Sequence, residues 1–290
     1  MFSGGIHGNE PSGVMALKDV MAIVRAHDIE LNGKIIALAG NLNALNSGIR
    51  FATEDLNRVW TRKRVERLES EPRDEWNPEQ FEQFELHSII KQTLAEEEGP
   101  FYFIDLHTTS GDTMPFITIN DALINRKFAE KFTVPIILGI EEYLEGPMLS
   151  YINEFGYVAC GFEAGKHESE ESYRNQVAFV LRTLEICGLM EATALPSFSE
   201  LIAPLDLGSH DFYEIRYRYA IENGENFQMK PGFKNFEMIE SGEVLAESNG
   251  RLIEAPQSGQ IFMPLYQKQG DDGFFIIRRI NRWALGLSAV

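Results

Sequence analysis

MFSGGIHGNEPSG, residues 1–13, organises the rest of this 290-residue chain. It places His7 and Glu10 three residues apart, beside glycines. An imidazole and a carboxylate at this spacing can reach one cation from a tight turn or a first helical turn, and they need only a third ligand to hold zinc with one coordination position open. The stretch predicts a short strand, a metal-binding turn and a helix whose start is marked by Pro11 and Ser12.

The H-x-x-E spacing is not specific by itself, because it occurs twice more, at His27–Glu30 and His167–Glu170. Only the first pair follows a strand-like segment and runs into a helix. We therefore interpret His7 and Glu10 as metal ligands, and the pair at His27–Glu30 as exposed residues near the end of the first helix.

Apolar runs alternate with helical patterns from residue 1 to about 190. The runs expected to be buried strands are 34–40, 101–106, 115–119, 135–140 and 157–162. The expected helices are 13–26, 77–96, 121–132, 147–155 and 169–186. This alternation predicts an α/β domain with a doubly wound, mostly parallel sheet.

The best-marked helix begins at Asn77, with Pro78 at its first position and Gln80 at its third. Its expected apolar face is Phe81, Phe84, Leu86, Ile89, Ile90 and Leu94. The charge-dense residues 62–76 before it are expected to be a solvated surface.

The pattern changes after Leu195-Pro196-Ser197. Alternating apolar residues and glycine turns at roughly 8–12 residue spacing are typical of a small barrel or sandwich. The chain is therefore expected to divide into an α/β catalytic domain at 1–197 and an all-β domain at 198–290 that covers the active site.

Ligands of open α/β sheets bind outside the C-terminal ends of the strands. His107 and Glu163 each follow a predicted strand, so both are expected there with His7 and Glu10. Two histidines and one glutamate form the ligand set of hydrolytic zinc, which leaves Glu163 free to act as general base.

Structural interpretations of these two residues stay open. His107 could be a core histidine held by Asp105 or by the hydroxyl of Thr108. Glu163 could be a capping or solvated carboxylate in a loop that also holds Glu168.

The loop NSGIRFATEDLNRVW, residues 46–60, carries Arg50 and Arg58. A guanidinium fork suits bidentate recognition of a carboxylate, and the adjacent amide of Asn57 can donate to the same group. A phosphate would fit as well. The alternative is that both arginines are surface residues paired with neighbouring acidic side chains.

A formal charge of −18 argues against nucleic acid or an anionic membrane as partner, but it is compatible with a small anionic substrate bound by arginines in a cleft. Cys160 and Cys187 are too few for a disulfide framework, which favours the reducing cytoplasm. No secretory or membrane-spanning segment is recognised. A homo-oligomer is compatible with these features.

Together the motifs resemble the succinylglutamate desuccinylase/aspartoacylase family within the zinc carboxypeptidase superfamily. The resemblance covers most of the chain and rests on four ordered motifs, GGIHGNEPSG, IRFATEDLNRVW, FIDLHTTSG and GFEAG. It implies a zinc carboxypeptidase-like fold in which His7, Glu10 and His107 hold one zinc and Glu163 is the general base.

The same resemblance implies roles in substrate binding. Arg50 would polarise the scissile carbonyl and stabilise the oxyanion, while Asn57 and Arg58 would bind a substrate carboxylate. Residues 264–275, PLYQKQGDDGFF, are similar to a segment that lends a tyrosine to the site, which makes Tyr266 an expected substrate contact. Tyr266 as an ordinary strand residue is the alternative.

Two departures from the family pattern stand out. The chain begins almost on the metal motif, so an edge of the sheet is expected to be missing. No arginine lies between Tyr151 and Cys160, where aspartoacylase would be expected to place one for a side-chain carboxylate. This argues against N-acetylaspartate as the substrate.

The expected function is zinc-dependent hydrolysis of the amide bond of a small N-acyl amino acid. One alternative is a zinc carboxypeptidase, which would need a cleft open to peptides. The other is a non-catalytic metal-binding or interaction protein.

Overall fold

The computed structural model describes residues 1–208 and 210–281. Its strands are β1 (Phe2–Gly4), β2 (Ala37–Ala39), β3 (Tyr102–Thr109), β4 (Phe116–Ile119), β5 (Ile136–Leu138), β6 (Val158–Lys166), β7 (Phe212–Ala220), β8 (Phe227–Met229), β9 (Met238–Ile239), β10 (Val244–Ser248), β11 (Arg251–Glu254), β12 (Gly259–Phe262) and β13 (Asp272–Arg279).

The α-helices are α1 (Ser12–Ala26), α2 (Leu42–Ser47), α3 (Arg62–Ser70), α4 (Pro78–Glu96), α5 (Leu123–Ala129), α6 (Met148–Asn153), α7 (Glu170–Ile186) and α8 (Phe198–Ile202). Four short 3₁₀ helices of the described residues are η1 (Leu56–Arg58), η2 (Ile140–Glu142), η3 (Ala192–Ala194) and η4 (Ala203–Leu205).

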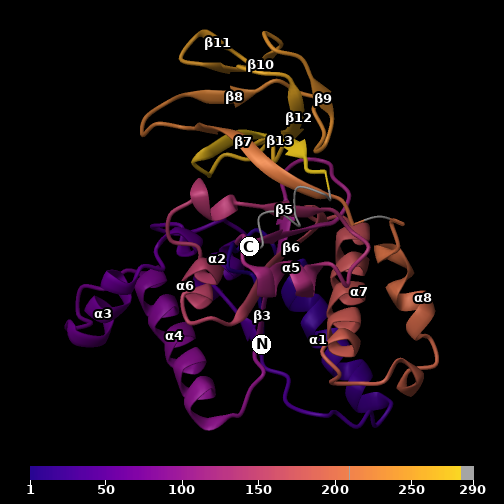
Figure 1. The fold of residues 1–290 in the computed structure, drawn as a ribbon. Helices are drawn as coiled ribbons and strands as arrows, with labels where there is room; N and C mark the ends of the chain where they lie inside the picture. Colours follow the sequence, from indigo (N-terminus) through magenta and orange to yellow (C-terminus); the bar gives the residue numbers. More distant parts are fainter. Residues whose placement is uncertain (209, 282–290) are drawn as a thin grey trace.

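A large mixed sheet runs through the molecule in the order β2-β1-β3-β6-β4-β5-β7-β13-β12-β9. Strands β2, β1, β3 and β6 are mutually parallel, and β4 turns the direction by pairing antiparallel with β6. A separate antiparallel sheet, β11-β10-β8, stands at the far end of the C-terminal region (Figure 1). This confirms the predicted α/β class with a smaller C-terminal β structure.

Helices cover both faces of the N-terminal part of the sheet (Figure 1). One face packs against α1, α5 and α7 through a core that includes Val20, Phe128 and Phe179. The other face packs against α3, α4 and α6 through a second core that includes Val65 and Ile152. The C-terminal ends of β1, β3 and β6 lie together at the edge of the sheet where open α/β sheets bind ligands.

Local signals at two helix starts are confirmed. The side chain of Asn77 accepts a hydrogen bond from the backbone N–H of Gln80. The side chain of Gln80 in turn accepts one from the backbone N–H of Asn77, which completes a capping box at α4. Ser169 likewise accepts from the N–H of Glu171 at the start of α7.

The predicted burial of the run 34–40 is wrong. Only Ala37–Ala39 form a strand, and this strand is largely exposed because β2 lies at the edge of the sheet. An apolar run cannot report whether a second neighbouring strand exists.

The predicted apolar face of α4 is only partly correct. Phe81 and Ile89 are exposed, whereas Glu79 and Gln83 are fully buried. The buried polar residues have partners: Glu79 accepts from three groups in the 41–53 region, and Gln83 donates to the carbonyl of Val59. Helix α4 thus uses polar side chains to hold the loop that precedes it in sequence.

The charged run 62–76 is also more than a solvated surface. Residues 62–70 form α3, and its Val65 and Leu68 are buried. A short helix can bury two apolar residues while its other side chains face water.

The predicted division at residue 197 stays a prediction. The large sheet crosses it, because β7 pairs in parallel with β5. The first residues after the division are helical rather than strand, and Phe198 and Leu205 join the core beneath α7. Residues 209 and 282–290 of the predicted β region lie outside the described residues.

None of the helices in the described residues has the length and apolar character needed to span a membrane.

Candidate metal centre and active-site cavity

Three strand ends bring the predicted ligands together. His7 and Glu10 lie in the turn between β1 and α1, and His107 lies near the end of β3. Strands β1 and β3 are parallel neighbours with Gly4 opposite Leu106, so the turn after β1 lies beside His107. In the next register pair, His107 stands opposite Glu163 of β6. Four residues from three distant parts of the sequence are thereby placed at one edge of the sheet.

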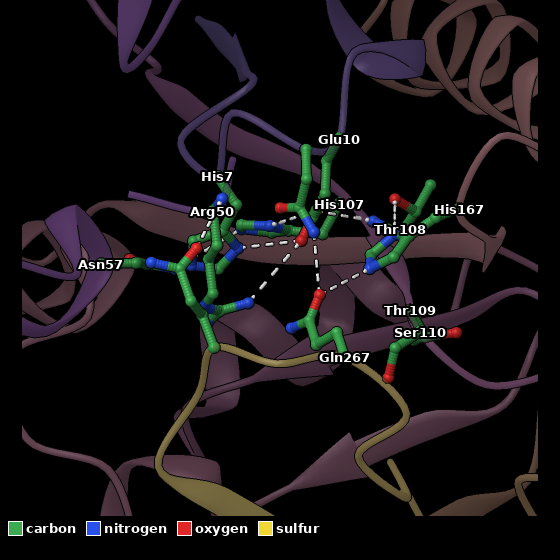
Figure 2. A network of polar contacts seen from close by, with 12 residues as sticks. His7, Glu10, Arg50, Asn57, His107, Thr108, Thr109, Ser110, His167 and Gln267 are labelled. Carbon is green, nitrogen blue, oxygen red and sulfur yellow. Dashed lines mark hydrogen bonds and ion pairs between the residues drawn. The ribbon is translucent and has the colours of Figure 1, made fainter. Parts of the chain in front are cut away.

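Side-chain atoms of His7, Glu10 and His107 form a compact cluster (Figure 2). One ligand atom from each lies within 4.8 Å of the others, and all three residues are buried. Nδ1 of His7 lies 3.0 Å from Oε1 of Glu10, and Nδ1 of His107 lies 3.1 Å from its Oε2. Both imidazoles therefore face the carboxylate of Glu10 with Nδ1.

The other nitrogen of each imidazole faces a second carboxylate. Nε2 of His7 lies 3.2 Å from Asp55, and Nε2 of His107 lies 2.6 Å from Asp105. A carboxylate in this position fixes the orientation of a ligating histidine and increases its basicity. From the sequence, Asp105 is expected only as a structural partner of His107, and no local pattern connects Asp55 with His7.

The electrostatics of the cluster favour a positive charge at its centre. Burial alone would raise the pKa of Glu10, but His7 and His107 outweigh it and hold this pKa well below its usual range. Burial would lower the pKa of His107, yet Asp105 and Glu10 outweigh it and hold that pKa well above its usual range. A metal cation bound to these side chains in place of protons would be attracted by the same carboxylates.

The donor set fits zinc. It offers two imidazole nitrogens and one carboxylate oxygen, which is the protein ligand set of catalytic zinc sites that keep a fourth position open. The carboxylates of Asp55 and Asp105 supply the outer contacts that such ligands normally have.

Gly8 is required by a close approach of two backbones. A Cβ at this position would lie 2.1 Å from the carbonyl carbon of Ala44 in α2, a distance that real Cβ atoms do not show. The N–H of Gly8 also donates to the carbonyl of Arg50 at 3.0 Å. Glycine therefore lets the ligand turn pack directly on the segment that carries the arginines.

Replacing Gly8 with alanine is expected to lower the free energy of unfolding by at least about 1–3 kcal/mol, because backbone atoms must move apart to admit the methyl group. Denaturant unfolding measures this change. Gly111→Ala is the matched control, since a Cβ there would make ordinary contacts no closer than 3.4 Å. Equal midpoints for Gly8→Ala and the wild type would contradict the packing argument.

Glu163 is a buried carboxylate with a free acceptor. Its Oε2 has no hydrogen-bond partner among the described residues, and burial raises the pKa of its carboxyl to about 8. A base whose pKa lies near the working pH transfers protons most efficiently. The open interpretation of Glu163 as a solvated or capping carboxylate does not fit this burial.

The loop arginines are held by acidic partners. Nε and Nη2 of Arg50 both donate to Asp55 Oδ2, at 3.0 and 2.9 Å, and Nη1 lies 3.9 Å from Glu10. Arg58 donates from Nη2 to Asp272 at 2.8 Å. Arg50 therefore stands beside the metal centre, and Arg58 stands at the junction with the C-terminal region.

Asn57 faces the same centre from η1. Its Nδ2 lies 3.5 Å from Nε2 of His107, and its Oδ1 accepts from the N–H of Met148. Figure 2 shows Asn57 and Arg50 on one side of the ligand cluster.

The structure does not bring Tyr266 into the site. Its hydroxyl donates to the carbonyl of Lys230 at 2.9 Å and accepts from the N–H of Phe233 at 3.0 Å. The neighbouring Gln267 reaches the site instead. Its Oε1 accepts from Asn9 at 2.8 Å. Tyr266 and Gln267 lie in the irregular segment between β12 and β13, so Tyr266 is not a strand residue either, and no strand alternation fixes which side chain faces the site.

Gln267 also contacts His167, whose H-x-x-E pattern is expected from the sequence to be a chance match. Oε1 of Gln267 lies 3.1 Å from Nε2 of His167, and Nδ1 of His167 lies 2.7 Å from the hydroxyl of Thr108 (Figure 2). The position of His167 just after β6 was the available signal, since that strand was already predicted to end at the site.

A cavity of about 120 Å³ lies between these groups. Its lining combines the ligand cluster, Glu163, both loop arginines, residues of β4 and α6, and a closing segment, residues 263–272. A volume below the roughly 300–1,000 Å³ of pockets for drug-sized ligands suits a small molecule.

Known proteins are similar to this chain in sequence. The family model of the succinylglutamate desuccinylase/aspartoacylase catalytic domain matches residues 1–187. Succinylglutamate desuccinylase of Chromobacterium violaceum is 25% identical over 108 residues, which are 37% of this chain and 30% of that protein. The enzyme of the same name from Shewanella piezotolerans is 28% identical over 112 residues, with the same shares. The match thus spans less than a third of the length of these relatives.

Solved structures match over almost the whole chain. Succinylglutamate desuccinylase of Vibrio parahaemolyticus has a TM-score of 0.68 at 15% identity, covering 97% of this chain and 81% of that one. A succinylglutamate desuccinylase/aspartoacylase of Rhodobacter sphaeroides has a TM-score of 0.68 at 20% identity, covering 96% and 84%. A product-bound ectoine utilization protein of Ruegeria pomeroyi gives 0.68 at 17% identity over the same shares. Likeness at these identities establishes the fold.

Proposed function

Since the family model matches residues 1–187 of 290, the chain belongs to the succinylglutamate desuccinylase/aspartoacylase family, and we propose that it is a zinc-dependent hydrolase that cleaves the amide bond of a small N-acyl amino acid. The observation that carries this proposal is the shared cavity of the His7, Glu10 and His107 cluster with the free carboxylate oxygen of Glu163.

Zinc, when bound, would supply Lewis acidity that polarises a carbonyl and acidifies water. In this proposal, Glu163 accepts a proton from the attacking water and returns it to the leaving nitrogen. Arg50 stabilises the negative charge that develops on the carbonyl oxygen. Asn57 and Arg58 bind a substrate carboxylate in this proposal.

A small substrate is favoured over a peptide. The closing segment contributes Pro264, Leu265 and Gln267 to the lining, and it is tied to the site by the contacts of Gln267. A peptide chain would need this segment to move aside. The unpartnered Oε2 of Glu163 in turn favours catalysis over a purely metal-binding role, because a buried polar atom without a hydrogen-bond partner is costly.

Metal analysis combined with a hydrolysis screen over acetyl-, succinyl- and formyl-amino acids tests the proposal. The expected result is about one zinc per chain and release of a free amino acid from at least one class. Release of C-terminal residues from peptides would instead identify a carboxypeptidase. Zinc binding without hydrolysis of N-acyl amino acids or peptides would indicate a non-catalytic metal-binding protein.

The two arginines are expected to respond differently to lysine. Arg58→Lys should raise KM with little change in kcat, because a substrate carboxylate is present in both the ground state and the transition state. Arg50→Lys should lower kcat by about 10²–10³-fold, because its role begins when the carbonyl becomes tetrahedral. Steady-state kinetics on one substrate separates the two effects.

Arg62→Lys serves as the control, since the side chain of Arg62 is 60% exposed and pairs with Glu154 on the surface. The opposite pattern, KM for Arg50 and kcat for Arg58, would require the two roles to be exchanged. Unchanged kinetics in both variants would make the loop structural.

A further inference from the structure

Each arginine of the cavity already has a carboxylate partner. Among the described lining residues, Arg50 and Arg58 carry the guanidinium groups and no lysine is present. Arg50 is paired side-on with Asp55, and Arg58 is paired with Asp272 of β13. The net positive charge available to a substrate is therefore smaller than the two arginines alone would give.

Asp272 is shared between two arginines. Its Oδ2 accepts from Arg58 at 2.8 Å, and its Oδ1 accepts from Nε of Arg218 at 2.6 Å. Two guanidinium groups and one carboxylate leave this cluster with a net charge of +1. Arg58 also donates from Nη1 to the carbonyl of Asn57, which leaves further N–H groups of its five free for a ligand. One added carboxylate would neutralise the cluster.

The cavity wall built by β4, α6 and β6 is uncharged apart from Glu163. Its described lining residues from these elements are Thr118, Ile119, Leu149, Ser150, Ala159 and Gly161. A second substrate carboxylate against this wall would lose its water without gaining a cationic partner, which is strongly unfavourable. The cavity thus balances one carboxylate and opposes another.

We propose, on the basis of the function proposed above, that Asp272 sets the charge selectivity of the site: the substrate carries one carboxylate, and its acyl group and amino-acid side chain are uncharged. By neutralising half of an arginine pair, Asp272 removes the charge that would hold a second carboxylate. Succinylglutamate, which carries several carboxylates, is then a poor substrate.

Substrate pairs that differ only in charge test the proposal on the zinc-loaded wild-type chain. The pairs are N-acetylglutamine against N-acetylglutamate, and N-acetylasparagine against N-acetylaspartate. The amide member is expected to have a kcat/KM at least about tenfold higher, because its side chain needs no counter-ion. Equal or faster hydrolysis of the carboxylate members would overturn the charge selectivity and leave amide hydrolysis intact.

Binding of free glutamine and glutamate, measured by calorimetry, gives the same comparison without turnover. Tighter binding of glutamine by a protein that hydrolyses no N-acyl amino acid would support the charge selectivity and refute the proposed function. Glutamate bound as tightly as glutamine would overturn the charge selectivity whatever the activity.

Asp272→Asn tests the residue itself. It raises the charge of the cluster to +2, so the kcat/KM ratio of N-acetylglutamate to N-acetylglutamine should rise at least about tenfold over the wild-type ratio. Asp211→Asn is the matched control, because Asp211 is also paired with an arginine, Arg279, and lies outside the described cavity lining. An equal rise in both variants, or no rise in Asp272→Asn with its fold verified by thermal unfolding, would refute the role of Asp272.

Discussion

Replacing His107 with alanine is expected to abolish stoichiometric zinc binding and, with it, hydrolysis. His107 supplies one of three ligands, and its loss leaves a histidine and a carboxylate that cannot close a tetrahedral site. The variant also leaves Asp105 buried without its imidazole partner. Metal analysis after dialysis against a weak chelator measures the zinc content directly.

His27→Ala is the matched control for this experiment. His27 belongs to the same H-x-x-E pattern, but it is exposed at the end of α1 and outside the ligand cluster. It should keep full zinc content and activity. Tight, stoichiometric zinc in a folded His107→Ala variant would mean that the ion is held elsewhere.

Glu163→Gln is expected to keep zinc and fold while turnover falls by about 10²–10⁴-fold, the usual loss when a general base is removed. Glutamine has nearly the same shape as glutamate, but its amide cannot accept a proton at neutral pH. The effect should fall on kcat, because the amide occupies the same buried space beside the cluster. Single-turnover kinetics on a zinc-loaded sample separates this loss from loss of metal.

Glu168→Gln provides the control and the competing candidate. Glu168 lies in the turn after β6 and is exposed, so its replacement should leave turnover unchanged. Normal turnover in Glu163→Gln together with a large loss in Glu168→Gln would transfer the role of base to Glu168.

The sequence determined the features that depend on neighbours along the chain. The capping box at Asn77 and the H-x-x-E spacing of His7 and Glu10 are local, because hydrogen bonds and side-chain reach over three residues follow from backbone geometry. The sequence also predicted that His107 and Glu163 would meet the first pair. That inference is possible because the ends of parallel strands lie at one edge of a sheet.

Tertiary structure alone decided the contacts between distant loops. Gln267 reaches Asn9 across 258 residues, and Asp272 reaches Arg58 across 214 residues. Both pairings depend on β13 joining the same sheet as the ligand strands, which no local pattern records. Many acidic and amide side chains in the sequence could have paired with these groups. The order of the strands in the sheet selects the side chains that actually pair. The same order also determines the charge and size of the cavity.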